Sequence, residues 1–234
     1  MILRIAILSS AILLGFGLNS ELKARESANG QIVDISVKND EGAYFSIKAP
    51  SKADTGFAKI LDSLSKCVAS KTKINIAELF RTEGTGVPLT FENITENIGK
   101  EDFGKCLPPH ATETNANMEL YIGRFAQALY LRDFPSLPEI SLRDLRVSRA
   151  YPEHPVFVAM LNIADCVTMK NPSEVDRLLR TKSGSFDEFL ALREMEPHFM
   201  SCLPPQGGVE TGSVMIRGTF AFSIYARANG LTKQ

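Results

Sequence analysis

Residues 67–82 read CVASKTKINIAELFRT, and residues 166–181 read CVTMKNPSEVDRLLRT. The two stretches share Cys, Val, Lys, Leu, Arg and Thr at the same positions, without a gap. Such a match within one chain indicates an internal duplication, and a duplication decides the architecture of the whole protein.

Two further blocks recur in the same order. Residues 103–109, FGKCLPP, match residues 199–205, FMSCLPP. Residues 123–132, GRFAQALYLR, match residues 218–227, GTFAFSIYAR. Because the order and the approximate spacing of three blocks are kept, we expect two tandem copies of one structural unit.

The N-terminus has the pattern of a secretory signal peptide. Residues 1–20 read MILRIAILSSAILLGFGLNS, in which Arg4 is followed by an uncharged, mostly apolar run. This run is shorter than the roughly 20 residues that a membrane-spanning helix needs. We therefore expect export to the periplasm or the medium, with no transmembrane segment left after removal of the signal.

All of the cysteines lie beyond this segment. An even number of cysteines in an exported chain favours disulfide bonds over thiol chemistry or metal binding. Each copy holds one cysteine early and one in its CLPP, and the duplication favours pairing within each copy. A pairing between the copies would require that the disulfide connectivity of the ancestral unit had changed. The expected pairs are Cys67 with Cys106 and Cys166 with Cys202.

The apolar residues of each copy recur at helical spacing. We expect four helices in each copy, with the disulfide joining the first helix to the end of the third, where the double proline ends that helix. The predicted class is all-α, with repeat 1 over residues 57–132 and repeat 2 over residues 156–234. In repeat 2, Ser185 and Glu188 have the spacing of a capping box that opens the third helix, and Pro197 could kink it.

Two segments fall outside the repeats. Residues 21–56 form a leader, and the alternating pattern of residues 31–49 around a turn-like NDEG fits either a short β-hairpin or a disordered segment. Residues 133–155 contain four prolines and are expected to form an extended linker or a docking segment.

Composition and motifs exclude several classes of function. The formal net charge is -1 and no basic run could neutralise several phosphates, which argues against nucleic-acid binding. No nucleophile elbow, zinc motif, haem motif or phosphate-binding glycine loop occurs, so an enzyme is less expected than a binding protein, and no cofactor is expected. Met195, His198, Met200 and Cys202 could in principle hold Cu(I). The first copy lacks these ligands, so we expect a helix end rather than a metal site.

Several polar residues are kept in both copies. They form three pairs: Lys71 with Lys170, Arg81 with Arg180, and Arg132 with Arg227. For the middle pair we expect arginines that cap the C-terminus of their helix. Tyr130 and Tyr225 are expected to pack within the fold. The acidic residues of both copies are expected to be solvated; they include Glu92, Glu96, Glu101, Glu188, Glu194 and Glu196.

The sequence thus predicts a non-enzymatic binding or scaffold module of the cell envelope. Its partner, either an envelope protein or a small ligand, would meet helical surfaces or the groove between the two copies. The alternative is an envelope hydrolase with its site in the cleft between the repeats.

Overall fold

The computed structural model describes residues 21–26, 32–38, 42–48, 52–71, 99–106, 118–143, 155–204 and 208–230. The expected signal peptide, Arg81, and the segment where the second helix of repeat 1 was expected lie outside these residues. The described helices are α1 (Lys52–Lys71), α4 (Lys100–Cys106), α5 (Met118–Asp133), α6 (Pro155–Lys170), α7 (Pro172–Arg180), α8 (Phe186–Glu194), α9 (Glu196–Met200) and α10 (Ser213–Ala228). The strands are β1 (Glu21–Glu26), β2 (Ile32–Lys38), β3 (Tyr44–Lys48) and β4 (Gly208–Gly212).

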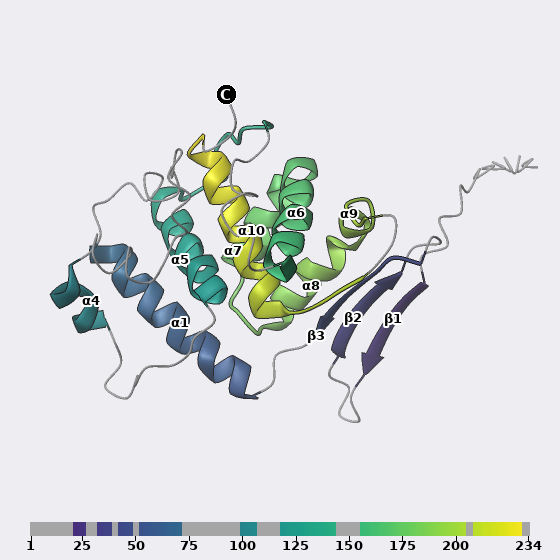
Figure 1. Ribbon diagram of the computed structural model, residues 1–234, viewed down its shortest axis with the longest axis horizontal. Coiled ribbons are helices and arrows are strands. Elements are labelled where there is room, and N and C mark those ends of the chain that lie inside the picture. The colour runs from purple at the N-terminus through teal and green to yellow at the C-terminus, as the bar shows by residue number, and fades with distance from the viewer. Residues whose placement is uncertain are drawn as a thin grey trace, which may run out of the picture.

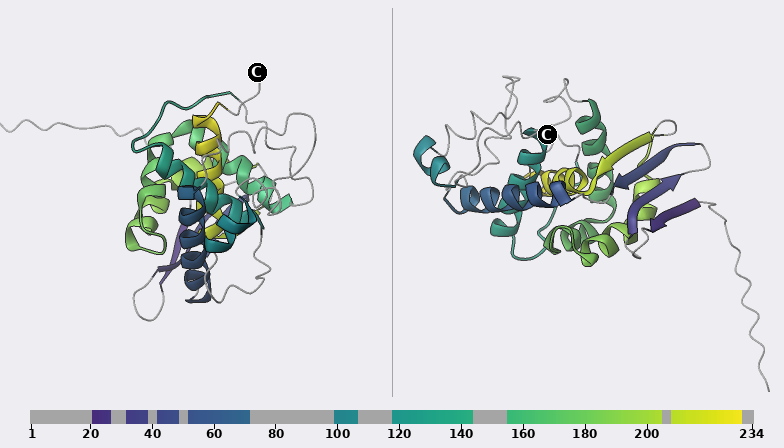
Figure 2. Two further views of the ribbon diagram at one scale, coloured as in Figure 1. Left: turned by 90° about the vertical axis from the view of Figure 1, so that its left-hand side faces the viewer. Right: turned by 90° about the horizontal axis from the view of Figure 1, so that it is seen from below.

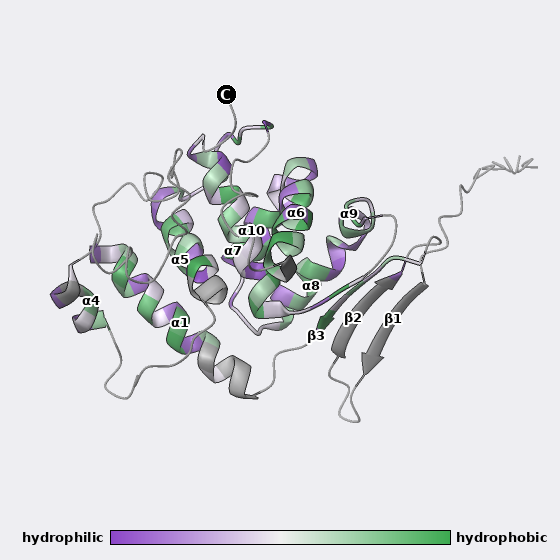
Figure 3. Ribbon diagram, viewed as in Figure 1, coloured by the Kyte–Doolittle hydropathy of each residue, from purple (hydrophilic) through white to green (hydrophobic). Residues whose placement is uncertain are grey.

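The described part of the chain is mostly helical, and its strands lie together at one end of the helical body (Figure 1). Figure 2 shows the same separation of helices and strands from a second direction. Helix α10 lies at the centre, where it packs against α5 on one side and α6 on the other, and α1 packs against α5. Apolar residues alternate with polar ones along the outer helix α1 (Figure 3), as expected of a helix with one buried face.

Two glycines set the distance between α5 and α10. A Cβ atom on Gly123 would stand 2.5 Å from the Cα of Gly218, and one on Gly218 would stand 3.2 Å from the Cα of Gly123. Ordinary contacts between carbon atoms lie at about 3.5–4.0 Å. The two helix backbones therefore touch at a point where neither helix has a side chain. These glycines are the first residues of the third repeated block.

The hairpin expected within residues 31–49 is present, because β2 pairs with β3 in antiparallel fashion. It belongs to a larger sheet of order β1-β2-β3-β4, in which β1 is antiparallel to β2 and β4 is parallel to β3. The sequence did not predict β1 or β4. Phe45 attaches the sheet to the helices, since its ring stacks on Phe199 at 4.7 Å and Phe199 lies 5.6 Å from Phe220.

The disulfides join Cys67 to Cys106 and Cys166 to Cys202, which is the pairing expected from the repeat. The first bond ties α1 to the end of α4, and the second ties α6 to the turn after α9. In both cases the second cysteine opens a CLPP tetrapeptide. Each bond thus closes a loop of similar length, with sequence separations of 39 and 36 residues.

The helix that was expected to open at Ser185 is interrupted, as Pro197 suggested. It consists of α8 and α9, which meet at Met195. Proline lacks a backbone N–H and its ring clashes with the preceding turn, so one continuous helix is disfavoured at this position. Within the described residues, none of the helices combines the length and apolar character needed to cross a membrane.

Candidate functional site

The turn between α7 and α8 is shaped by a glycine and a helix cap. Gly184 has a φ of +71°, a conformation that a residue with a side chain rarely adopts. Ser185 then caps α8 by accepting a hydrogen bond from the backbone N–H of Glu188 at 3.2 Å, as the capping-box spacing predicted. The Glu188 carboxylate turns back and accepts the N–H of Gly184. These two hydrogen bonds, one made by Ser185 and one by Gly184, therefore fix the conformation of the turn.

Glu188 is buried, so the expectation that it is a solvated surface acid is wrong. Its side chain is almost inaccessible, and its Oε1 accepts a hydrogen bond from Nη1 of Arg217 at 3.0 Å. Arg217 is equally buried, and its Nη2 donates to the backbone carbonyls of Leu179, at 2.8 Å, and Thr181. The capping-box position places this carboxylate on the inner face of α8, where a buried arginine requires a partner.

A second buried arginine comes from α5. Arg124 donates from Nη1 to Gln127 at 3.1 Å and forms an ion pair with Asp62 of α1 at 3.2 Å. Its Nη2 donates to the hydroxyl of Ser183 at 3.1 Å, and its Nε is buried without a hydrogen-bond partner. The Gln127 side-chain oxygen also accepts from Arg217 at 3.2 Å, which links the two arginines into one network.

Burial of the two guanidinium groups is electrostatically unfavourable, because it disfavours their charged form. Burial lowers the pKa of Arg124, and the carboxylates of Asp62 and Glu188 oppose this effect. Burial likewise lowers the pKa of Arg217, again opposed chiefly by Glu188. Because arginine remains charged in proteins, both guanidinium groups stay charged, with Asp62 and Glu188 as their carboxylate partners.

A pocket of about 360 Å³ opens beside this network, between α1 and the α7–α8 turn. Its polar lining is formed by Lys59, Asp62, Ser63, Lys66, Lys182 and Ser183. Lys59, Ser63 and Lys66 follow one another at intervals of four and three residues, and Asp62 lies next to Ser63, so the α1 residues share one face of the helix. Among the described residues, the three lysines form no ion pair. The pocket lining therefore combines three lysines with Asp62 and Ser183, and both of these last two contact the buried Arg124.

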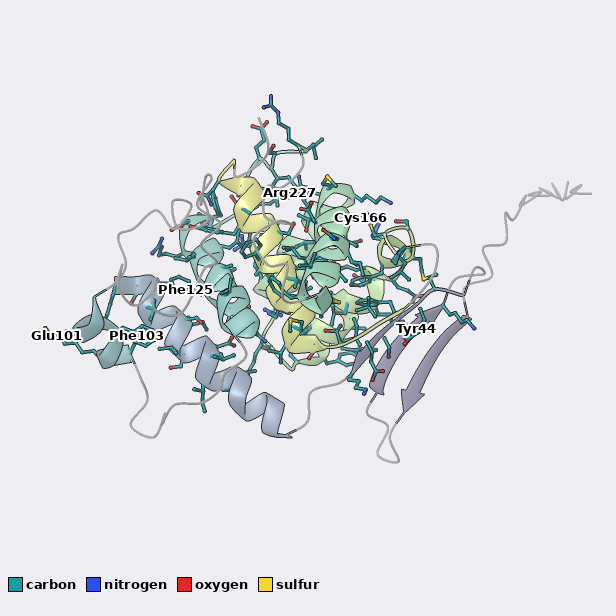
Figure 4. The ribbon with its side chains drawn as sticks, viewed as in Figure 1. Tyr44, Glu101, Phe103, Phe125, Cys166 and Arg227 are labelled. Atoms are coloured by element: carbon teal, nitrogen blue, oxygen red, sulfur yellow. A yellow bond between two sulfur atoms is a disulfide. The ribbon has the colours of Figure 1, made fainter. Side chains whose placement is uncertain are left out.

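The repeated arginines 132 and 227 lie near the ends of α5 and α10 and hold neighbouring segments together. Arg227 is buried and donates two hydrogen bonds of 2.7 Å to the carboxylate of Asp165. Its Nη1 donates to the carbonyls of Ser141 and Arg143, which fixes the described part of the expected linker against α10. Figure 4 shows Arg227 near one end of α10, with Cys166 on the neighbouring helix. Arg132 donates to the carbonyl of Ala69 in α1.

The repeated tyrosines are buried and join the halves of the chain. The Tyr130 hydroxyl of α5 donates to Asp176 of α7 at 2.6 Å, and the Tyr225 hydroxyl of α10 contacts Asp133 of α5 at 3.1 Å. Arg180 binds the same Asp176 and donates to a carbonyl in the segment after α5, rather than capping its own helix.

The remaining predicted positions have local roles. Lys170 donates to the carbonyl and the hydroxyl of Ser201, beside the second disulfide, and Lys71 lies exposed in the last turn of α1. His198 contacts Asn171 at 3.0 Å and lies 3.6 Å from Glu174. Since Cys202 is in a disulfide, it has no thiolate to offer a metal. The described residues contain no group of three or more His, Cys, Asp or Glu side chains that could hold a metal ion.

The sequence reasoning missed the arginines of this network, although a signal was present. Arg124 and Arg217 each stand in a largely apolar helical stretch, LYIGRFAQALY and VMIRGTFAF. An arginine with apolar residues on every side of the helix must be buried, and a buried cation needs a partner. The partners themselves lie far away in the chain and could not have been assigned from local spacing.

Comparison of the chain with protein-family models, with curated proteins and with solved structures finds no match. The function must therefore be inferred from the pocket, its charges and the elements that form it.

Proposed function

We propose that the chain is an exported, non-enzymatic binding module of the cell envelope, built from two tandem copies of a helical unit. Its ligand would occupy the pocket between α1 and the α7–α8 turn. Two features support the location: the disulfides, which persist in oxidising compartments, and the signal-like pattern of the first 20 residues. On this proposal the mature protein acts in the periplasm or in the medium.

Three correspondences support the tandem copies. Helices α1 and α6 each carry the first cysteine of a disulfide, and the second cysteine follows at the end of α4 or just after α9. Helices α5 and α10 contain the third repeated block. The contact between Gly123 and Gly218, which are equivalent positions in that block, brings the two copies together through matching helices.

The single observation that carries the binding proposal is the position of the pocket. One wall comes from α1, in the first copy, and the other from the α7–α8 turn, in the second. A hollow at the junction of two units is a common place for a ligand site. The buried Arg124 spans this junction, because it contacts Asp62 in one copy and Ser183 in the other.

The chemistry of the pocket favours binding over the hydrolase considered from the sequence. Acid–base hydrolysis by carboxylates generally needs two of them on opposite sides of the scissile bond. Among the described residues, Asp62 is the pocket's one carboxylate, and Arg124 already binds it.

The test fills the pocket with a large side chain. Ser63 is exposed in the pocket wall, so Ser63→Trp should block the pocket without disturbing the core. Ser70→Trp is the matched control, because Ser70 is an exposed serine on the same helix outside the pocket lining. Thermal unfolding is followed with a panel of anionic, neutral and cationic small molecules, since a ligand of the folded state raises the unfolding temperature.

The proposal expects at least one compound that stabilises the wild type and Ser70→Trp but not Ser63→Trp. Equal stabilisation of all three proteins would place the binding site elsewhere. A panel in which no compound stabilises the wild type would contradict a small-molecule binding role.

A further inference from the structure

We infer that the pocket recognises an oxyanion, either a phosphate or a carboxylate group carried by a small ligand. This inference rests on the proposed function, because it names the ligand class of the same pocket. Its first support is the imbalance of charge. Lys59, Lys66 and Lys182 line the pocket, and Arg124 lies behind them, whereas Asp62 is the one carboxylate in the lining.

The lysines approach from two directions. Lys59 and Lys66 stand two turns apart on α1, on the same face, and Lys182 comes from the opposite wall. None of them has an ion-pair partner among the described residues. Like charges that face one another across a small hollow repel, and an anion placed between them removes that repulsion. The arrangement is stabilised by a ligand of negative charge.

Ser183 supplies a directed donor. Its oxygen accepts a hydrogen bond from Nη2 of Arg124 at 3.1 Å, so its own proton must point elsewhere. No acceptor for that proton lies among the described residues, and Ser183 lines the pocket. A hydroxyl held in this way by a cation is a good donor to a phosphate or carboxylate oxygen, because the cation strengthens its polarity.

Arg124 also contributes through its burial. The side chain is 1% exposed, and its Nε has no hydrogen-bond partner among the residues that the structure describes. Its two contacts in the pocket wall, Asp62 and Ser183, place the guanidinium directly behind the lining. A buried cation with a single, partly exposed carboxylate partner in that wall attracts a further negative charge.

The experiment uses inorganic phosphate and citrate as probes, with sodium chloride at matched ionic strength as the reference. Binding is measured by calorimetry and by the rise in unfolding temperature. We expect both anions to stabilise the protein more than chloride does, and the stronger of the two identifies the preferred group. Lys66→Gln and Lys182→Gln should each weaken binding about two- to fivefold, as expected for loss of one exposed charge contact.

Two further variants distinguish recognition of the anion by pocket residues from nonspecific attraction by the charge of the protein. Ser183→Ala should weaken binding although it changes no charge, and Asp62→Asn should tighten it because a repelling carboxylate is removed. The matched control is Lys38→Gln, which makes the same change of charge on an exposed lysine of β2, outside the pocket lining. It should leave the affinity unchanged.

The inference is overturned if Lys38→Gln weakens binding as much as Lys182→Gln, or if neither anion stabilises the protein more than chloride. A neutral or cationic compound whose effect is lost in Ser63→Trp would overturn the oxyanion inference and leave the binding proposal intact. If Ser63→Trp binds phosphate and citrate as the wild type does, the pocket itself is the wrong location.

Discussion

Replacing Gly123 by alanine should destabilise the protein substantially, because there is no room for a methyl group between α5 and α10. The new Cβ would lie 2.5, 2.8 and 3.0 Å from the Cα, C and O atoms of Gly218, all of which are backbone atoms and cannot rotate away. To reach an ordinary carbon–carbon separation of about 3.5 Å, the helices must separate by about 1 Å.

The expected change in the free energy of unfolding combines two destabilising effects and one stabilising effect. Overpacking of a core costs about 1–3 kcal/mol, and a gap of 0.5–1 Å forfeits about a quarter to a half of each dispersion contact along the interface. Alanine gains about 1 kcal/mol over glycine as a helix former. The net expectation is a loss of about 2 kcal/mol, which lowers the unfolding temperature of a chain of this size by about 4–8 °C.

The assay is urea and thermal unfolding followed by circular dichroism, with two companion variants. Gly218→Ala places its Cβ 3.2 Å from the nearest backbone atom, so a shift of a few tenths of an ångström suffices, and its stability should stay within about 1 kcal/mol of the wild type. Gly56→Ala is the control for helix propensity. It lies in α1 with nothing within 4 Å of the added atom, and should gain about 0.5–1 kcal/mol. The reasoning is refuted if Gly123→Ala is as stable as the wild type, or if Gly218→Ala costs more than Gly123→Ala.

Three other outcomes can be measured in the same way. Cys202→Ser opens a loop with a sequence separation of 36 residues and should cost about 4 kcal/mol in the chain-entropy model; an unchanged unfolding temperature would speak against the bond. Arg227→Lys cannot keep both hydrogen bonds to Asp165 and should lower the free energy of unfolding by about 3 kcal/mol, whereas a loss below 1 kcal/mol would show that the pair contributes little. Burial and the hydrogen bond to Asp176 raise the pKa of Tyr130, so the neutral tyrosine stabilises the fold fully below about pH 10 and this contribution is lost as the pH rises further. The free energy of unfolding of the wild type should therefore fall more steeply between pH 10 and 11 than that of Tyr130→Phe, and parallel profiles would contradict this.

Much of the helical architecture could be predicted because it depends on local signals. Ser185 and Glu188 marked the start of α8, and Pro197 marked the break between α8 and α9. The repeated sequence blocks indicated the disulfide pairing, since each set of blocks holds one early cysteine and one in its CLPP. These features can be predicted from short stretches of sequence or from a comparison of the chain with itself.

The sheet and the pocket could not be predicted in this way. β4 is a short stretch, GVETG, in which only Val209 and Thr211 are β-branched and glycine stands at both ends, so it carries little strand signal of its own. It is a strand because β3 offers a free edge to it. The pocket combines α1 with the α7–α8 turn, and its central arginine comes from α5. Only the folded structure brings these three parts together, so local patterns indicated a solvated position for Glu188, which is buried.

The parallel pairing of β3 with β4 has a consequence for the order of folding. Phe45 lies opposite Val209, so the last strand of the sheet can be added only after the long segment between them, with helices α1 to α9, has been made. Contacts between such distant residues form late, because a long loop must close before they contribute. Until then β3 has an open edge, and open edges are where chains pair with one another and aggregate. Strand β4 therefore completes the sheet and ends a period in which the incomplete chain is open to aggregation.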